Sequence, residues 1–528
     1  MLLASLLFAL LGVSPVMHRS GGAASLDAEV DVALSRGRLE IHDRSGPRRY
    51  RSTPDMVVLG WAPIVVAEKR ALLIWFLRRD ENERGVVPHD SGWMSYGHTP
   101  WINHHLALLA PRGPAVAARW MSSGLQGVDA VWVDPPSGIL LRSGREVHRF
   151  AFSGWQLDRV PGVAPALADV AVETGLLDIA SVGDIMLGRG TARALDHLGL
   201  EAAFGEVRPW LERADLRVGN LESCFTSDET RPEGLRSFFA PRRHLGALAL
   251  LRFDVVSLAN NHCDAPDAAF SRALLMTQGI EGLTHTASAR ILRRGVAVEV
   301  LALRALPGEA DGLMTRERAA QLERLARGAE LVLVEVHWGE ELSPEPTAEQ
   351  RRLGAWLLQH GVAAVLGHHP HVVQPLELVS PSGVIAFSQG NFVFDQEGYT
   401  PTAATQRGAV VELRYHRQLG LTARTRAIDI THRAVVRPTR SRRAGRPLPG
   451  SGPRRHEGLH RRHAAPCREV GVRAVAPQFS ILLRGWGCRA PRRAARPNWV
   501  LGPASRSGET DPPWWSAPTR ISPGFSST

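Results

Sequence analysis

Six short polar clusters in this chain each follow a run of apolar, strand-like residues. Their side chains are carboxylates, carboxamides and imidazoles, which are the groups that hold divalent cations in proteins. Loops at the ends of neighbouring strands can bring such groups to one point. The sequence therefore predicts a metal site, with its ligands drawn from residues 183–184, 219–222, 260–262, 337–339, 368–371 and 388–391.

The segments between these clusters predict the elements that position them. Apolar runs such as LLDIASVGD, FDVVSLANNH and VAAVLGHHPH have the length of buried strands. Helix-like stretches lie between them at 191–198, 242–251 and 348–360. Alternating strands and helices indicate an α/β domain with largely buried strands. We place this domain at residues 176–430.

Residues 28–175 favour a small β-rich accessory region, because short apolar runs are broken there by Pro, Gly and charged turns. The adjacent pair His104 and His105 is expected at the surface. Four tryptophans of this region are expected in its core rather than on a ligand-binding surface: Trp61, Trp75, Trp101 and Trp132.

The N-terminal run MLLASLLFALLGVSPVM has the length of a signal peptide and precedes small residues. We therefore predict a cleaved signal or a short anchor within 1–27, and an extracytoplasmic protein that is secreted or membrane-anchored. The run has no basic residues before it, so a buried helix or a wrongly assigned start stays open. Four cysteines form no CxxC motif and are expected to be free thiols: Cys224, Cys263, Cys467 and Cys488.

The net charge of +11 is unevenly distributed along the chain. Residues 431–528 hold 19 arginines against 4 acidic residues, so the remainder is mildly acidic. No recognisable nucleic-acid-binding module is present, and we expect no nucleic-acid partner. The Arg, Pro, Gly and Ser content of 431–528 predicts a disordered tail. The alternative is a shifted reading frame in the source gene.

In sequence order, GDIMLGRG, GNLESCFT, VEVHWGEELSPEPTAEQ, LGHHPHVVQPLEL and FSQGNFVFDQ resemble the CapA-type capsule-synthesis family. That family is linked to poly-γ-glutamate capsule production, and its fold is similar to that of calcineurin-like metallophosphoesterases. The resemblance implies a four-layer αββα sandwich with a two-metal centre at one sheet edge. Six side chains would hold the cations: Asp184 and His371 the first, Asn261, His337 and His369 the second, and Glu222 both.

Two cations that share ligands can polarise a water molecule and stabilise the charge of a hydrolytic transition state. Manganese, iron, zinc and magnesium all suit this donor set. The resemblance places His262 beside the substrate as a proton donor. Arg189 and Arg407 could contact an anionic substrate, although a surface salt bridge is an equal alternative for each. His368 is not expected to be a ligand.

The chain departs from the metallophosphoesterase pattern at two places. The usual Asp-x-His motif ends here in Met186, so the first metal lacks one ligand. The turn NNHCDAPD carries Asp264 and Asp267 in place of a family Asp-x-Gly. Trp338 and Phe392 are expected to pack beneath the loops rather than to touch substrate.

Two classes of function remain open. The first is a metal-dependent hydrolase that acts on a phosphoester or a polymer amide bond. The second is a non-catalytic component for assembly or export of an anionic capsule polymer, within a membrane-associated synthesis complex. Met186 favours the second class, whereas His262 and a bridging Glu222 favour the first.

Overall fold

A computed structural model describes most of the chain up to residue 439. The described residues are 22–26, 29–88, 94–125, 127–134, 138–144, 146–161, 174–228, 238–263, 265–379, 383–396 and 403–439. The predicted signal sequence, Asp264, Cys467, Cys488 and most of the predicted tail lie outside them. The chain divides into two compact units, 1–445 and 446–528, and every described residue belongs to the first.

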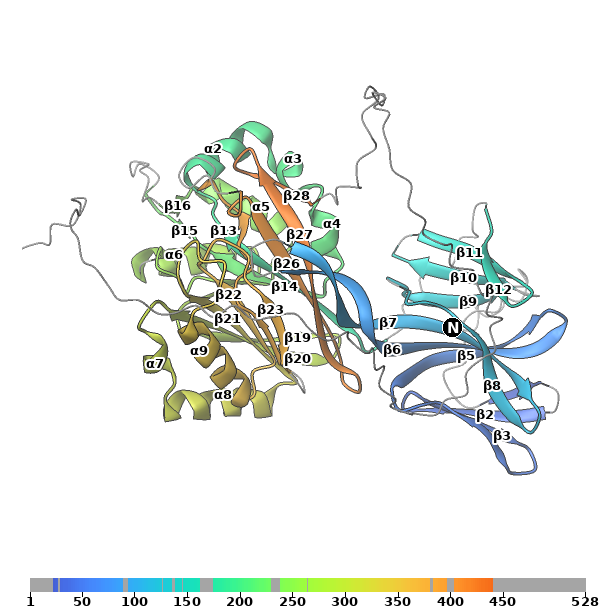
Figure 1. Cartoon of the computed structure of the whole chain (residues 1–528). Helices are drawn as coiled ribbons and strands as arrows, with labels where there is room; N and C mark the ends of the chain where they lie inside the picture. The colour runs from blue at the N-terminus through green and yellow to red at the C-terminus, as the bar shows by residue number, and fades with distance from the viewer. Residues whose placement is uncertain are drawn as a thin grey trace, which may run out of the picture. The chain divides into compact units, whose positions relative to one another are not determined.

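The N-terminal part of this unit consists of strands (Figure 1). One four-stranded sheet contains β1 (Gly22–Ser25), β2 (Glu29–Ser35), β3 (Arg38–Asp43) and β4 (Arg48–Arg51). Another contains β9 (Ala130–Asp134), β10 (Gly138–Ser143), β11 (Glu146–Ser153) and β12 (Gln156–Arg159). Consecutive antiparallel pairs join β5 (Met56–Val66), β6 (Lys69–Pro88), β7 (Met94–Arg112) and β8 (Ala115–Met121).

The predicted core tryptophans of this region, Trp61, Trp75, Trp101 and Trp132, are all at most 2% exposed, which confirms that prediction. The expected surface position of His104 and His105 is wrong, because both side chains are buried, at 4% and 1% exposed. Nδ1 of His104 accepts a hydrogen bond from Nε1 of Trp75, and Nε2 of His105 lies 2.9 Å from the Asp80 carboxylate. Burial and the nearby Arg414 charge lower the pKa of His104 to about 3.

Two sheets carry the polar clusters, and the first of them is continuous with β5–β8 through the pairing of β27 with β6. The first contains parallel β13 (Leu177–Ile185), β14 (Leu216–Leu221), β17 (Val255–Ser257) and β18 (Glu281–Leu283), followed by antiparallel β26 (Arg407–His416) and β27 (Gly420–Thr431). The second has the order β19 (Ser288–Arg293), β20 (Val296–Ala305), β21 (Leu331–Trp338), β22 (Ala364–His368), β24 (Gly383–Ala386) and β23 (Leu376–Val379). Strands such as β13, β21 and β22 are buried on both faces, which is why they read as continuous apolar runs.

A shared apolar core joins the two sheets. Ile179 and Val218 of the first sheet pack in one cluster with Val300, Leu333 and Leu366 of the second. The two sheets therefore lie face to face. Strand β28 (Val435–Pro438) pairs with β27 and buries Val436, so the first sheet continues past the domain boundary predicted at residue 430.

Helices cover the outer faces of both sheets (Figure 1). Those that share a core with the first sheet include α2 (Arg189–Leu198), α3 (Leu200–Phe204), α4 (Arg208–Glu212), α5 (Leu245–Leu250) and α6 (Ala265–Met276). Those that share a core with the second are α7 (Ala310–Leu313), α8 (Arg316–Gly328) and α9 (Ala348–Gln359). The predicted α/β class of this region is confirmed. A capping box between Thr347 and Gln350 starts α9 where the sequence predicts a helix.

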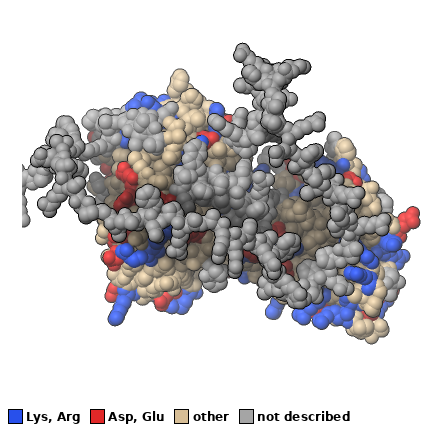
Figure 2. Space-filling model, viewed as in Figure 1, with Lys and Arg blue, Asp and Glu red and all other residues tan. Residues whose placement is uncertain are grey.

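The face drawn in Figure 2 carries both acidic and basic side chains on its described residues, so no single sign of charge covers it. The strongly basic end of the chain, from residue 440 onwards, lies outside the described residues. Among the described residues, every helix is too short or too polar to cross a bilayer.

Candidate metal centre

The structure brings the six predicted ligand side chains together. Asp184 and His337 each stand one residue before the end of a strand, β13 and β21, and Glu222 directly follows β14. The remaining three lie in turns that follow strands: Asn261 after β17, and His369 and His371 after β22. The strands are parallel within each sheet, so their carboxyl ends meet at one edge.

Two overlapping groups of ligand atoms form at this edge. Asp184, Glu222 and His371 each offer an atom, and these atoms lie within 4.8 Å of one another. Atoms of Glu222, His337 and His369 meet the same limit. Oδ1 of Asn261 lies 2.8 Å from Nε2 of His337. Glu222 is common to both groups, so the geometry suits two neighbouring cations that share one carboxylate.

The two carboxyl groups are fully buried, and their pKa values shift in opposite directions. Burial alone would raise the pKa of Asp184, but the adjacent imidazoles of His368 and His371 hold this pKa well below its usual value. Burial and the negative charge of Asp184 raise the pKa of Glu222 well above its usual value. Two buried carboxylates this close cannot both ionise easily without a cation. A cation at Glu222 would remove that conflict.

Two of the imidazoles near these carboxyl groups are neutral at neutral pH. Burial and the charge of His369 lower the pKa of His337 well below its usual value. Burial and the charge of His371 lower the pKa of His369 to about 4. Metal ions bind the neutral form of histidine, so these two side chains need not lose a proton first.

Among the six candidate ligands, two buried atoms have no hydrogen-bond partner in the described part of the chain: Oε1 of Glu222 and Nδ1 of His369. Nε2 of His371 lies 3.3 Å from this oxygen without making a hydrogen bond. A buried polar atom without a partner costs about 1–3 kcal/mol. A divalent cation would satisfy such atoms, so the residues present fit a metal.

The backbone of the His369 turn is strained. His369 has a φ of 95° and His371 a φ of 58°, in the region that side-chain-bearing residues rarely adopt. Such strain persists where surrounding structure holds it, and it is typical of binding sites. Here it accompanies two imidazoles directed to the same group of carboxylates.

His368 is a buried partner of the Asp184 carboxylate. Its Nε2 lies 2.6 Å from Oε2 of Glu335, and its Nδ1 lies 3.4 Å from Oδ1 of Asp184. Burial lowers the pKa of His368, but the nearby carboxylates of Asp184 and Glu335 outweigh it and raise the pKa to about 9. Sequence reasoning missed Glu335. Its signal is the spacing from His337, because residues two apart in a strand face the same side.

The two arginines proposed for anion binding are both in ion pairs. Arg189 is 6% exposed and donates to Oδ1 of Asp395 over 2.5 Å. Its guanidinium also lies over the ring of Phe238, which stacks on His262. Arg407 lies 3.6 Å from the Asp429 carboxylate. The surface salt bridge considered for Arg189 is therefore a buried one.

The remaining residues singled out from the sequence are mostly buried. Met186 is 0% exposed, so a buried thioether stands where the Asp-x-His motif would have an imidazole. Trp338 and Phe392 are at most 1% exposed, which confirms that they pack beneath the loops. Asp267 lies in α6 and is mostly buried.

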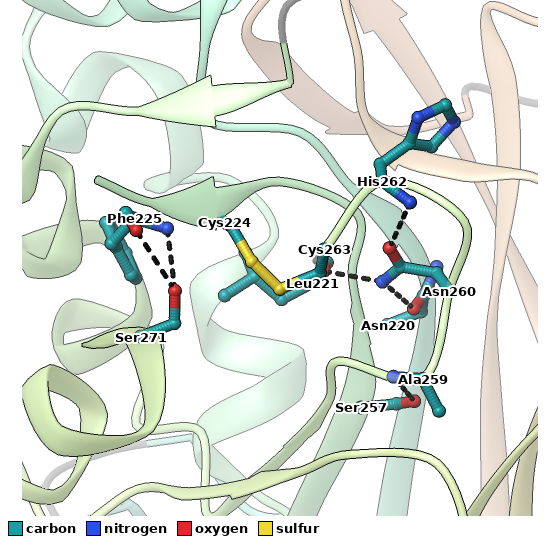
Figure 3. The surroundings of a disulfide bond; sticks show 10 residues. All are labelled: Asn220, Leu221, Cys224, Phe225, Ser257, Ala259, Asn260, His262, Cys263 and Ser271. Atoms are coloured by element: carbon teal, nitrogen blue, oxygen red, sulfur yellow. Dashed lines mark hydrogen bonds between the residues drawn. A yellow bond between two sulfur atoms is a disulfide. The ribbon is translucent and has the colours of Figure 1, made fainter. Parts of the chain in front are cut away.

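A disulfide joins Cys224 and Cys263, so the expectation of free thiols is wrong for these two (Figure 3). Cys224 follows Glu222 by two residues, and Cys263 directly follows His262. The sequence does not predict this disulfide, because its two cysteines are 39 residues apart and form no spacing motif. The disulfide therefore ties the Glu222 segment to the turn that carries His262.

The Asn260 side chain makes a second link between the same segments (Figure 3). Its Nδ2 donates to the carbonyl of Leu221 over 2.9 Å, and its Oδ1 accepts from the backbone N–H of His262 over 3.1 Å. In Figure 3 the His262 ring points away from the disulfide. These two links thus fix the backbone of the turn, and neither of them uses the imidazole of His262.

Reduction of this disulfide should destabilise the protein by about 2–4 kcal/mol, because the closed loop restricts the unfolded chain. We expect a thiol reductant to lower the urea midpoint of the wild-type full chain. The matched control is the double variant Cys224→Ser, Cys263→Ser, which should unfold at the lower midpoint and show no further response to reductant. An unchanged wild-type midpoint in reductant would contradict this expectation.

Comparison with known proteins adds a family relationship. Residues 178–289 and 284–396 match the family model described as bacterial capsule synthesis protein PGA_cap. The chain is 27% identical over 295 residues to the PGA biosynthesis protein CapA of Bacillus subtilis (strain 168), which covers 50% of this chain and 74% of that protein. It is 28% identical over 258 residues to the capsule biosynthesis protein CapA of Bacillus anthracis, covering 44% and 62% respectively.

Among solved structures, a hypothetical protein from Thermus thermophilus matches 48% of this chain and 100% of its own chain, at 20% identity. The TM-score of this match is 0.32.

Proposed function

The central region of this chain belongs to the CapA-type capsule-synthesis family, and on that premise we propose that the protein is a capsule-biosynthesis hydrolase with a two-metal site. The proposed substrate is a phosphoester or an amide bond of an anionic polymer such as poly-γ-glutamate. The observation that carries the hydrolase proposal is the position of Glu222, which two groups of ligand atoms share.

The proposal includes the architecture of the domain predicted at 176–430. Two sheets face each other across one core, and each has helices on its outer face. This order of layers supports a four-layer αββα sandwich of the metallophosphoesterase type. The site would then occupy the edge at which the parallel strands of both sheets end.

Two divalent cations, when bound, would supply a polarised water molecule and positive charge for the transition state. Asp184 and His371 would hold the first, Asn261, His337 and His369 the second, and Glu222 both. Carboxylate, amide and imidazole donors fit manganese, iron, zinc or magnesium. His368 and Glu335 would keep the Asp184 carboxylate in place, as outer partners commonly do for metal ligands.

His262 has the position of a group that exchanges protons with substrate. Its side chain is 19% exposed, and its Nε2 lies 3.6 Å from Oε1 of Glu222. Burial and the charges of His371 and His369 lower its pKa to about 3, so the imidazole is neutral before substrate binds. In this neutral state it is a weak base, and it would carry and donate a proton only after an anionic substrate has raised its pKa.

The cation affinity should fall as the pH is lowered through the raised pKa of Glu222, because a proton on this carboxyl competes with the cation. His369 competes only near its lowered pKa of about 4. Calorimetric titration of the metal-free full chain with Mn²⁺ at a series of falling pH values should show a falling affinity and the release of protons on binding. An affinity that does not change across these pH values would contradict the buried, protonated state of Glu222.

The proposal is tested by metal analysis and a substrate panel on the purified full chain. We expect about two divalent ions per chain and hydrolysis of a phosphodiester or a γ-glutamyl substrate. A chain that binds no divalent ion would overturn the proposed site. A chain that binds two ions but hydrolyses neither substrate class would favour a non-catalytic role in capsule assembly or export, which is the second candidate function.

That second candidate is a non-catalytic assembly or export component for an anionic capsule polymer, within a membrane-associated synthesis complex. Met186 favours it, because the buried thioether occupies the place of a metal-binding imidazole. Both candidates would act outside the cytoplasm. The disulfide between Cys224 and Cys263 supports this location, since such bonds persist in oxidising compartments.

A further inference from the structure

The first proposed cation has fewer ligands than the second. Asp184, Glu222 and His371 surround its position, whereas the second has Glu222, His337, His369 and the nearby amide of Asn261. The residue that would complete the first set, Met186, carries only a thioether. Thioether sulfur suits soft metals, and cations such as Mn²⁺ and Mg²⁺ prefer oxygen. An additional oxygen donor would therefore strengthen this position.

A third group of possible ligand atoms lies at the same edge. Glu341, His369 and His371 each offer an atom, and these lie within 4.8 Å of one another. Glu341 stands in the turn that follows β21, three residues after the end of that strand, and it is exposed to solvent. His371 belongs to the first proposed cation and His369 to the second. Glu341 therefore lies on the solvent side, beside one histidine of each proposed cation.

The loop that carries Glu341 is hydrogen-bonded to the turn at residues 368–371, which we call the histidine turn. The backbone N–H of Leu342 donates to the carbonyl of Pro370 over 2.8 Å. Nε2 of Gln374 donates to the carbonyls of Ser343 and Glu345, over 2.9 and 3.2 Å. The residues that follow Glu341 are thus hydrogen-bonded to the histidine turn and to Gln374, which follows this turn in the chain region 372–374.

The backbone of this loop also supports a fixed position. Leu342 has a φ of 62°, in the left-handed region that a leucine adopts only where its surroundings hold it. Gln350 of α9 donates to Oε1 of Gln374 over 2.9 Å and so anchors the side chain that holds the loop. Glu341 is exposed, but the backbone beside it is held by several bonds.

A buried nitrogen atom of the histidine turn, Nδ1 of His369, has no hydrogen-bond partner among the described residues. His369 itself is 6% exposed. A buried imidazole nitrogen without a partner points to a ligand at this place, independently of the carboxylate beside it. Glu341 is the exposed member of a group whose two histidines are buried.

We propose that Glu341 is a further metal ligand, which completes the shell of the first cation in place of the imidazole that Met186 replaces. This proposal rests on the two-cation site proposed above, and the ligand it takes is a hard divalent cation. With Glu341 the site holds three carboxylates, with Asp184 and Glu222, against two doubly charged cations. The residual positive charge would still attract an anionic substrate.

The test compares Glu341→Gln with Glu340→Gln in the full chain. Glu340 is the matched control, because it is the adjacent residue, is also exposed and belongs to none of the three groups. Metal-free protein is titrated with Mn²⁺, and bound ions are counted. We expect two ions in the wild type and in Glu340→Gln. In Glu341→Gln one of them should bind at least about tenfold more weakly, as loss of even an outer partner commonly causes.

The melting temperature supplies a second readout. Without metal, all three proteins should melt together, because Glu341 is exposed. With Mn²⁺, Glu341→Gln should gain less stability than the other two, since weaker binding stabilises less. If Glu341→Gln binds both ions as tightly as the wild type, Glu341 is not a ligand. If the wild type binds no ion, the proposed two-metal function fails, and the role of Glu341 fails with it.

A rescue experiment tests the assignment to the first cation. Adding Met186→His to Glu341→Gln should restore the weakened ion, because an imidazole would then stand where this chain has a thioether. A well-folded double variant that still binds the ion weakly would contradict the assignment to this cation. If the double variant does not fold, the comparison of Glu341→Gln with Glu340→Gln still decides whether Glu341 binds metal.

Discussion

Glu222→Gln should remove at least one of the two cations and abolish hydrolysis. Glu222 is 0% exposed and is the one side chain common to the groups around both proposed cations. Glutamine keeps its shape but has no negative charge to bind a cation. Metal content of the purified variant, measured beside its activity on the substrates of the wild type, checks this expectation.

The same variant should fold normally without metal. Burial and the charge of Asp184 raise the pKa of Glu222, so the metal-free wild type already favours an uncharged side chain there. Glutamine resembles that protonated form, and its metal-free melting temperature should equal or exceed that of the wild type. A variant that keeps two ions and full activity would remove Glu222 from the site. A variant that fails to fold without metal would contradict the protonated state inferred here.

His262→Ala should leave both cations bound and slow hydrolysis by about 10²–10⁴-fold, the usual contribution of a positioned proton-transfer group. His262 belongs to none of the groups of ligand atoms, and its imidazole is partly exposed beside Glu222. The turn should survive the change, because Asn260 and the disulfide hold its backbone. Metal content and kcat of the variant, measured on one preparation, separate proton transfer from metal binding.

The pair of variants also separates the two candidate functions in cells that depend on this protein for their capsule. A hydrolase would lose capsule formation with either change. Normal capsule with His262→Ala and none with Glu222→Gln would indicate that metal-stabilised structure matters and catalysis does not. Wild-type behaviour of both variants would remove the metal site as the source of function.

The sequence by itself predicted the α/β class and the place of each polar cluster at a strand end. Both follow from local patterns, because a strand buried on both faces must be apolar along its length and turn residues must follow it. The burial of Trp61 and Trp338 could be predicted for a similar reason, since large aromatic side chains contribute most to a core.

Only the tertiary structure showed the partners of these residues. Glu335 faces His368, Arg189 faces Asp395 and Glu341 faces the histidine turn across long stretches of chain, and no local pattern records which distant segment lies opposite.

The disulfide and the buried His104 and His105 have the same explanation. Cys224 and Cys263 meet because β14 and β17 are neighbours in the sheet, and neither cysteine lies in a spacing motif. The two buried histidines lie where β7 pairs with β6, which brings Trp75 and Asp80 of β6 within reach. Local patterns determined where each strand ends, but the order of the strands decided which side chains meet there.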